Sequence, residues 1–296
     1  MKYIITGSLG NISLPVTKNL VNAEHDVTVI SSSTDKKSEI EALGAHAAIG
    51  SVEDVTFLKS VFKNADVAYL MVPSSFAIED YIKFQHQVAD NYIEALKGSS
   101  IKHVVLLSSI GAHLRKGAGP IDALGYLEEK LLALPGLNLS FLRPSYFFTN
   151  LYSQAGLIEN AGIAGGNFGD TDEKLVLVHT SDISKVASEQ LLNLFTGNRI
   201  TYISSDERHP SEIAAILGKA LGKENIPWVP FTDAQSLEGM LGAGLNQGFA
   251  DAYVAMGQSI RSGKLQEEYW KNRPETLGSY KLENFAKEFA GANQNA

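Results

Sequence analysis

The sequence predicts an α/β protein with a doubly wound parallel sheet and a smaller C-terminal α/β subdomain. Over the first 150 residues, short runs rich in β-branched and apolar residues alternate with longer stretches expected to be helical. Most of the short runs are continuously apolar rather than alternating, which is typical of strands covered on both faces. The chain has 296 residues, 44% of them hydrophobic, and can bury a large core. Strands and helices that alternate in this way join through right-handed crossovers into a parallel sheet.

The elements of the first half follow in order along the chain. The expected strands are Tyr3–Thr6, Asp26–Ser31, Ala47–Ile49, Val67–Val72, His103–Ser108 and Leu139–Leu142. The expected helices are Ile12–Ala23, Lys36–Leu43, Val52–Phe62, Asp80–Leu96 and Ala123–Leu134. Pro15 falls in the first turn of its helix, where the missing N–H costs little.

The pattern changes after about residue 150. Residues 1–150 are expected to form one domain, and residues 151–296 a smaller, mostly helical substrate subdomain that packs on it and returns some chain to the first sheet. The run LVLVHTSDISKVASEQLLNLF predicts a short strand and then an amphipathic helix with Asp182 as its N-cap. RITYISS predicts another strand, and HPSEIAAILGKALG another capped helix that ends near Gly222.

The amino-acid composition excludes several classes of function for this protein. The net charge is −8 and the pI about 5.4, so the field of the whole molecule repels phosphate backbones, and no direct nucleic-acid partner is expected. The absence of cysteine excludes disulfides, a thiolate nucleophile and cysteine-ligated metals, and the histidines show no metal-ligand spacing. No apolar run reaches the roughly 18 residues of a membrane helix. The first residues also lack a signal-peptide pattern, so a cytoplasmic protein is expected.

The opening stretch ITGSLGNIS predicts a nucleotide-binding turn. Gly7 and Gly10 follow the first strand and precede the first helix, which is where a doubly wound sheet binds its ligand. Gly7 allows a tight turn, and Gly10 allows the backbone to approach a diphosphate held by the amides that open the helix. Ser13 stands where a third glycine is common, and a serine is only slightly larger. The alternative is a turn that is kept for structure alone.

Several motifs resemble the NmrA-like family, a branch of the atypical short-chain dehydrogenase/reductase superfamily. TGSLGNIS is similar to that family's TGATGxxG, and GLNLSFLRPSYFFTNL is the most specific match. GSVED, VVLLSSIGA, VHTSDISKVASEQLL and RPETLGSYKLENF also match, so the resemblance spans nearly the whole chain. It implies a Rossmann-type NAD(P)-binding domain with a small α/β domain. Family members include quinone oxidoreductases and redox-sensing regulators that bind the dinucleotide without turning it over.

The resemblance also implies where a dinucleotide and a substrate would bind. Cofactor contacts are expected at the glycine turn and at the strand ends: Gly7, Ser8, Leu9, Gly10, Asn11, Ile12, Ser32, Ser33, Lys36, Ser51, Val52, Met71, Val72, Pro73, Ser108 and Ser109. Substrate contacts are expected from Phe76, Tyr146, Phe147, Phe148 and Asn150. Core packing is the alternative for the aromatic trio at 146–148, and a simple turn is the alternative for the two serines at 108 and 109.

The end of the second strand favours NADP(H) over NAD(H). Enzymes that prefer NAD usually carry Asp or Glu there to hold the ribose 2′-hydroxyl, whereas this chain continues with Ser32, Ser33 and then two lysines. Hydroxyls and lysines suit a 2′-phosphate. Relatives commonly have Arg at the position of Ser32 and an adenine-contacting Asp at the position of Ser51, so both of those contacts are missing. The alternative is that SSSTDKK is a solvated loop before the next helix.

The motif YLEEK matches the short-chain dehydrogenase pair YxxxK, in which a tyrosine donates a proton and a lysine lowers its pKa. Family register argues against that role for Tyr126 and Lys130. A glutamate on this helix precedes the Arg of LRP by 14 positions in the family, as Glu129 precedes Arg143 here. Counting back from Glu129 puts Gly125 and Ile121 at the lysine and tyrosine positions. Neither residue can transfer a proton, so we interpret YLEEK as structural.

Without that pair, hydride transfer to a quinone or small carbonyl compound from NADPH is the favoured function. A quinone can take its proton from water, and the reaction needs mostly proximity and an apolar slot. His113 is the one nearby candidate that titrates near neutrality, with a surface-loop histidine as the alternative. Two other functions stay open: a non-catalytic NADP(H)-sensing regulator with a protein partner, and an epimerase-like enzyme. A homodimer is also possible, and the sequence does not identify the acceptor.

Overall fold

The protein is described here by a computed structural model that covers residues 1–74, 78–169 and 173–293. Within these residues the chain forms a seven-stranded sheet in the order β10-β6-β5-β4-β1-β2-β3, with every neighbouring pair parallel. Its strands are β1 (Lys2–Ile5), β2 (Asp26–Ser31), β3 (His46–Ile49), β4 (Val67–Met71), β5 (His103–Leu107), β6 (Asn138–Pro144) and β10 (Asn198–Ile203). The predicted doubly wound parallel sheet is confirmed, and its order reverses direction between β1 and β4.

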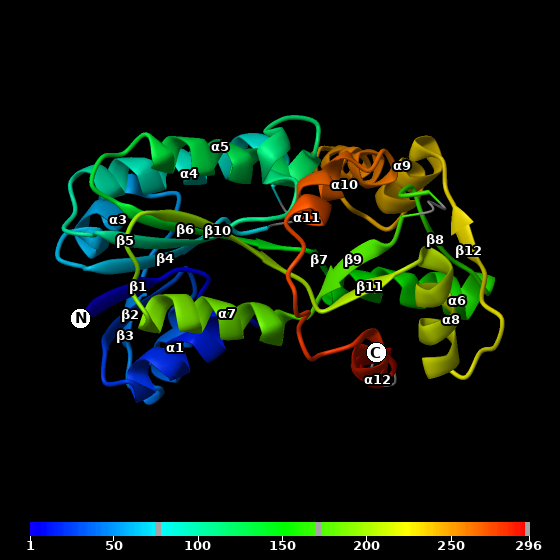
Figure 1. Ribbon diagram of the computed structural model, residues 1–296, viewed down its shortest axis with the longest axis horizontal. Helices are drawn as coiled ribbons and strands as arrows, with labels where there is room; N and C mark the ends of the chain where they lie inside the picture. Colours follow the sequence, from blue (N-terminus) through cyan, green and yellow to red (C-terminus); the bar gives the residue numbers. More distant parts are fainter. Residues whose placement is uncertain (75–77, 170–172, 294–296) are drawn as a thin grey trace.

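Helices cover both faces of this sheet, as Figure 1 shows. One face carries α3 (Val55–Phe62), α4 (Tyr81–Lys97) and α5 (Asp122–Leu132), and the other carries α1 (Ser13–Asn22), α2 (Lys37–Ala42) and α7 (Thr180–Leu192). Strand β4 shows why its sequence is continuously apolar. Ala68 and Leu70 enter the core under α3 and α4, while Val67 and Tyr69 enter the core under α1.

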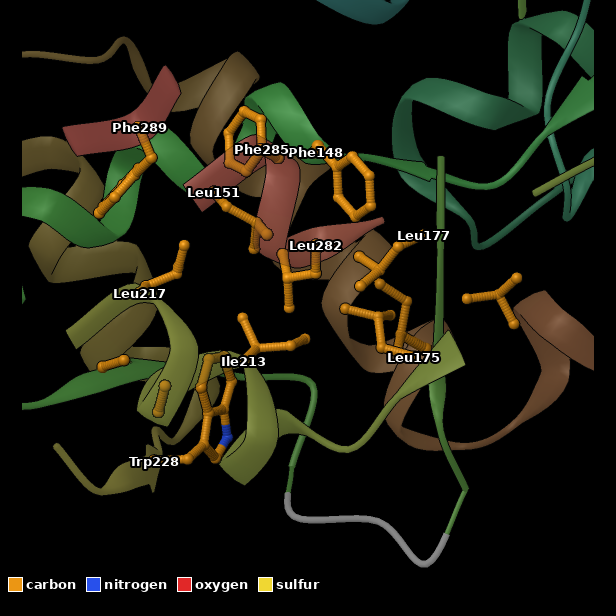
Figure 2. Close-up of a cluster of buried hydrophobic side chains, with 14 of the residues drawn as sticks. Phe148, Leu151, Leu175, Leu177, Ile213, Leu217, Trp228, Leu282, Phe285 and Phe289 are labelled. Atoms are coloured by element: carbon orange, nitrogen blue, oxygen red, sulfur yellow. The ribbon is translucent and has the colours of Figure 1, made fainter. Parts of the chain in front are cut away.

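The C-terminal part builds two small sheets and its own core. Strands β7 (Tyr146–Phe147), β9 (Leu175–Val178) and β11 (Asp206–Arg208) form one sheet, and β8 (Ala164–Gly166) pairs with β12 (Trp228–Pro230). Its helices are α6 (Ala155–Ala161), α8 (Pro210–Ala220), α9 (Asp233–Gly242), α10 (Gln247–Arg261), α11 (Glu267–Lys271) and α12 (Leu282–Asn293). Figure 2 shows the core that joins them, which includes Leu177, Ile213 and Phe285. No helix in the described ranges is both long and apolar enough to cross a bilayer.

Short 3₁₀ turns connect several of these elements. They are η1 (Thr34–Lys36), η2 (Ala112–Leu114), η3 (Gly119–Ile121), η4 (Phe148–Gln154) and η5 (Lys264–Gln266). Two of them, η2 and η3, lie between β5 and α5, and η3 contacts α10. The helix α10 therefore lies against the loop that leaves the carboxyl end of β5.

Chain beyond residue 150 also completes the first sheet. Strand β10 pairs in parallel with β6 at its edge, and α7 packs beside α1 on one face. The prediction of Asp182 as the N-cap of α7 is wrong by three residues. His179 is the N-cap, and its ring nitrogen accepts from the Ser181 amide at 3.2 Å. The Asp182 carboxylate is buried instead, where it accepts from Ser205 Oγ at 2.6 Å.

Candidate cofactor site

The turn after β1 has the left-handed backbone conformation expected at a glycine. Gly7 has a φ of +88°, and a Cβ there would lie 2.6 Å from Ser13 Oγ and 3.0 Å from Met71 Cγ. The Ser13 hydroxyl donates to the Thr6 carbonyl at 2.9 Å and is almost fully buried. A serine at the third glycine position therefore closes the turn by a hydrogen bond, and it requires glycine at position 7.

The N-terminus of α1 is open toward this turn. Within the described residues no side chain caps the helix, and its first turn carries no acidic residue. The first amides of a helix have no partner inside it, so they form a site of positive potential. In α1 the Leu14 amide already donates to the Gly10 carbonyl at 2.9 Å and Pro15 has no N–H, so the amides that can face a ligand are those at the start of the helix, up to Ser13. A Cβ at Gly10 would meet only the Gly7 carbonyl, at 3.2 Å, so the surface there is open. Leu9, Asn11 and Ile12 complete this loop, and its geometry fits a diphosphate.

The ends of β1 and β4 are joined by Thr6. Its hydroxyl accepts from the Met71 amide at 2.8 Å and donates to the Tyr69 carbonyl at 3.2 Å. The predicted residue Met71 thus lies beside Gly7, as the glycine contacts above also show. Val72 and Pro73 continue from it and are half-buried. The residues at the end of β4 that were predicted to contact the cofactor therefore lie next to the glycine turn.

Hydroxyl groups link the glycine turn to the end of β2. Ser8 Oγ donates to Ser31 Oγ at 2.9 Å, and the Ser33 amide donates to the same Ser31 oxygen at 3.3 Å. Ser32 is exposed beside them. Ser31 is not among the residues predicted from the sequence to contact the cofactor, although its place at the end of β2 indicates such a role. Lys36, in contrast, is paired with Glu39 through two contacts of 2.9 and 3.0 Å.

At two further positions predicted to contact the cofactor, the side chain forms a hydrogen bond within the protein instead. Ser108 is buried, and its hydroxyl donates to Glu128 Oε1 at 2.5 Å, so this side chain faces the interior. Ser51 accepts from the Glu53 amide at 3.1 Å in an exposed turn. The Val52 carbonyl accepts from Asn91 at 3.1 Å. Ser109 is half-buried at the end of β5.

The buried partner of Arg143 is one residue away from the glutamate used in the register count. Glu128, not Glu129, forms the buried pair with Arg143, through contacts of 3.0 and 2.5 Å. Glu129 lies on the surface and pairs with Arg115 at 2.6 Å. Counting back from Glu128 puts Leu124 and Pro120 at the lysine and tyrosine positions, and neither transfers a proton.

The side chains of YLEEK lie on different faces of α5: Leu127 and Glu128 are buried, Tyr126 is half-buried against α4, and the last two residues are exposed. Tyr126 donates to Asp90 at 2.7 Å, and this hydrogen bond raises its pKa to about 12. Lys130 Nζ lies 5.1 Å from the centre of the Tyr126 ring. Because Tyr126 joins α5 to α4, this placement agrees with a structural role.

The aromatic trio after β6 separates in the structure. Tyr146 lies 5.7 Å, ring to ring, from Phe168, whereas Phe147 packs in the core next to α7. Phe148 is fully buried and stacks on Phe285 at 5.3 Å (Figure 2), so its prediction as a substrate contact is corrected to a core residue. Asn150 is half-buried in η4, and Phe76 lies outside the described residues.

His113 lies in η2, directly after the carboxyl end of β5. In the described structure both of its ring nitrogens are buried and lack hydrogen-bond partners. Burial, together with the nearby Arg143, lowers its pKa, although Glu268 opposes the shift. The ring is therefore neutral near pH 7.

A protein-family model described as NAD(P)H-binding matches residues 7–160, which is more than half of the chain. The chain belongs to this NAD(P)H-binding family. The matched range contains the glycine turn from Gly7 onward, β2 to β6 and the start of the C-terminal part, so the family assignment covers most of the candidate cofactor site.

Known proteins that are similar to this chain in sequence or in fold include reductases and a regulator. The NAD(P)H azoreductase of Xenophilus azovorans is 24% identical over 252 residues, which covers 84% of each chain. The triphenylmethane reductase of Citrobacter sp. has a TM-score of 0.78 at 17% identity and covers 98% of this chain and 100% of its own. The NADPH-dependent quinone oxidoreductase QOR2 of Escherichia coli has a TM-score of 0.74 at 18% identity, covering 97% and 98%.

The negative transcriptional regulator NmrA, solved in complex with NADP, has a TM-score of 0.71 at 15% identity and covers 99% of this chain and 96% of its own. The resemblance to NmrA-like proteins of the atypical short-chain dehydrogenase/reductase type is thereby confirmed at the level of fold.

Proposed function

We propose that this protein is an NADPH-dependent oxidoreductase that reduces quinones or small carbonyl compounds. The observation that carries the proposal is the open N-terminus of α1 beside Gly7 and Gly10, at the point where the strand order reverses. There the first amides of α1 hold the diphosphate, and the hydroxyls of Ser8 and Ser31 lie toward the adenosine ribose. NADPH bound in this way supplies a hydride to the acceptor. The azoreductase and quinone oxidoreductase relatives support a reductase.

The choice of acceptor follows from the acid and base groups near the site. Counting back from Glu128 or from Glu129 finds no residue able to transfer a proton at the two family positions, and Tyr126 donates to Asp90 of α4. An alcohol or sugar substrate needs such a pair, whereas a quinone can take its proton from water. A flat aromatic acceptor is therefore the substrate class that these residues suit best.

The proposal is tested by following NADPH oxidation with a panel of quinones and small carbonyl compounds. We expect steady turnover with at least one quinone, with NADPH consumed and hydroquinone formed in equal amounts. Tight NADPH binding without turnover on any acceptor would instead support the second candidate, a redox-sensing regulator. The NADP-bound structure of NmrA is the observation that favours that candidate.

A preference for NADPH over NADH is proposed from the end of β2, where hydroxyls replace a carboxylate. The substitution Ser32→Asp puts a negative charge where the 2′-phosphate is expected. We expect NADPH affinity to fall about tenfold or more, the effect of roughly 1.4 kcal/mol of repulsion between like charges, while NADH affinity stays constant or rises.

The matched control is Ser100→Asp, because Ser100 is also exposed but lies before β5, at the amino ends of the strands rather than at their carboxyl ends. Titration calorimetry with both nucleotides measures the change. An equal loss for NADPH and NADH, or no loss with Ser32→Asp, would contradict the assignment of the 2′-phosphate to this loop.

A further inference from the structure

The last strand of the central sheet, β10, has one open side. Within the described residues β10 pairs with β6 alone. The carbonyls of Gly197 and Ile203 accept from amides of β6 and of the residue that follows it, at 3.1 and 3.0 Å. Successive residues of a strand direct their backbone groups to alternate sides. The N–H and C=O groups of Ile200 and Tyr202 therefore point away from β6.

The chain itself bonds to this open side just beyond β10. Ser204 lies two residues after Tyr202, so its carbonyl points the same way, and it accepts from the Gly278 amide at 2.7 Å. In the described ranges no strand continues this pairing along β10. The backbone groups of Ile200 and Tyr202 are therefore left for another extended chain.

The strand also lacks the residues that usually block an edge. It contains neither proline nor lysine. Its charged residue, Arg199, lies over the Phe195 ring at 3.7 Å. Ile200, in the middle of the strand, is 49% exposed. An open and partly apolar edge of this kind is a template for an added strand.

A pocket of about 580 Å³ lies along this open side, and we call it the edge pocket. Its walls are formed by β10 and by the chain after α11, and they include Ile200, Thr201, Tyr202, Asn272, Arg273 and Pro274. Because protein lies on both sides, the space suits a single strand, whereas a second copy would have to bring its whole sheet against β10. The sheet order places three strands between β10 and β1, a separation of roughly 19 Å, so the edge pocket is distinct from the glycine turn.

A phenol in the edge pocket has a hydrogen to donate. Arg143 also lines the pocket, with a side chain only 7% exposed, and its Nη1 donates to Tyr202 Oη at 2.9 Å. The Tyr202 oxygen thus accepts, and its own hydrogen finds no acceptor in the part of the chain that the structure describes. Burial raises the pKa of Tyr202, although Arg143 opposes the shift. Tyr202 is therefore protonated at neutral pH and acts as a donor.

A second donor comes from Arg273. Glu207 accepts from its Nε and Nη2 at 2.7 and 3.2 Å, which leaves Nη1 without an acceptor among the described residues. The carboxylate of Glu268 also lines the edge pocket, but Lys271 lies 2.9 Å from it and offsets its charge. Hydrogen-bond donors beside a guanidinium suit a carboxylate of the ligand.

We propose that the edge pocket binds an extended peptide that adds a strand to β10 and carries an acidic side chain. The backbone of the peptide pairs with Ile200 and Tyr202. Alternate side chains of an added strand lie on one face, so an apolar side chain contacts Ile200 while the acidic one accepts from Tyr202. The partner is thus a protein with an accessible, β-forming acidic segment. This inference goes beyond the proposed reductase function and does not depend on it.

The probe is the peptide acetyl-Glu-Thr-Val-Thr-Glu-amide, which has the same side chains in either strand direction, and its matched form has Gln for both Glu residues. Dissociation constants and amide exchange are measured by NMR on isotope-labelled protein. We expect saturable binding of the acidic peptide, with exchange slowed at the Ile200 and Tyr202 amides. The Gln peptide should bind about five- to tenfold more weakly. General attraction of an acidic peptide is not expected, since the chain has a net charge of −8.

Two variants separate the backbone and side-chain contributions. Ile200→Pro removes an N–H that points away from β6, a place where an edge strand tolerates proline, and should weaken the acidic peptide at least about tenfold. Tyr202→Phe keeps the backbone and should weaken it about five- to tenfold, the value of one hydrogen bond. Tyr152→Phe is the control, because that phenol is 36% exposed and belongs to η4, away from the edge pocket. Thermal melts check that each variant is folded.

Each outcome supports or overturns the inference. It is overturned if the acidic peptide does not bind saturably, if both peptides bind equally, or if folded Ile200→Pro binds as wild type does. Should Ile200→Pro fail to fold, an unchanged affinity in Tyr202→Phe overturns it. Dimerisation of the wild-type protein that Ile200→Pro abolishes, measured by light scattering, would assign β10 to a second copy instead. Absence of quinone turnover would refute the reductase proposal and leave the edge pocket unaffected.

Discussion

Replacing Gly10 with valine is expected to abolish pyridine-nucleotide binding and leave the fold intact. A Cβ at this position would meet only the Gly7 carbonyl at 3.2 Å, and Gly10 does not need a positive φ. The valine side chain would instead fill the space over the N-terminus of α1 that the diphosphate requires. Losing one or two charge-assisted hydrogen bonds to the diphosphate weakens binding about 100-fold or more.

The control for this prediction is Gly98→Val. Gly98 also lies outside the left-handed region, with a φ of −105°, and a Cβ there would meet nothing within 4 Å. Calorimetry with NADPH and a thermal melt of the free protein are compared for both variants. Normal nucleotide affinity in Gly10→Val would show that the diphosphate does not bind at this turn.

Replacing Glu128 with glutamine is expected to destabilise the free protein by about 3 to 5 kcal/mol, because it leaves the Arg143 charge buried without its partner. The side chains of this pair are only 6% and 7% exposed, and Ser108 also donates to the carboxylate. The pair joins α5 to β6, so its loss weakens the contact between the central sheet and one of the helices that cover it. Urea unfolding of the protein without nucleotide measures the change.

The neighbouring residue supplies a matched control. Glu129 is 55% exposed and pairs with Arg115 on the surface, so Glu129→Gln should cost less than about 1 kcal/mol. The double variant Glu128→Leu with Arg143→Leu removes both charges and should recover most of the lost stability. Similar losses for Glu128→Gln and Glu129→Gln would contradict the assignment of a buried pair that stabilises this layer.

The central sheet could be predicted because the apolar pattern of each strand indicates whether one or both of its faces are buried. Val67 to Leu70 are all apolar because alternate residues enter cores on opposite faces of the sheet. A strand with one face in solvent would instead alternate apolar and polar residues. The glycine turn was predictable for a similar reason, since Gly7 has a backbone conformation that other residues rarely adopt.

Features that depend on contacts between distant residues could not be predicted. Phe249 and Tyr81 are brought into ring contact at 5.0 Å by the packing of α10 on α4, and nothing in the local sequence of either residue indicates the other. The choice between Glu128 and Glu129 was different, because a signal existed. Glu128 is three residues before the buried Leu131, on the same helical face, whereas Glu129 turns outward. Helical phase, rather than a count to Arg143, identifies the buried carboxylate.

The central claim is that the first turn of α1 binds the diphosphate of a pyridine nucleotide, and titration calorimetry of the wild-type protein tests it most directly. We expect NADPH to bind at one site per chain, more tightly than NADH, with the heat of binding lost in Gly10→Val. If none of NADPH, NADP⁺, NADH and NAD⁺ produces a binding isotherm with folded protein, the claim is contradicted.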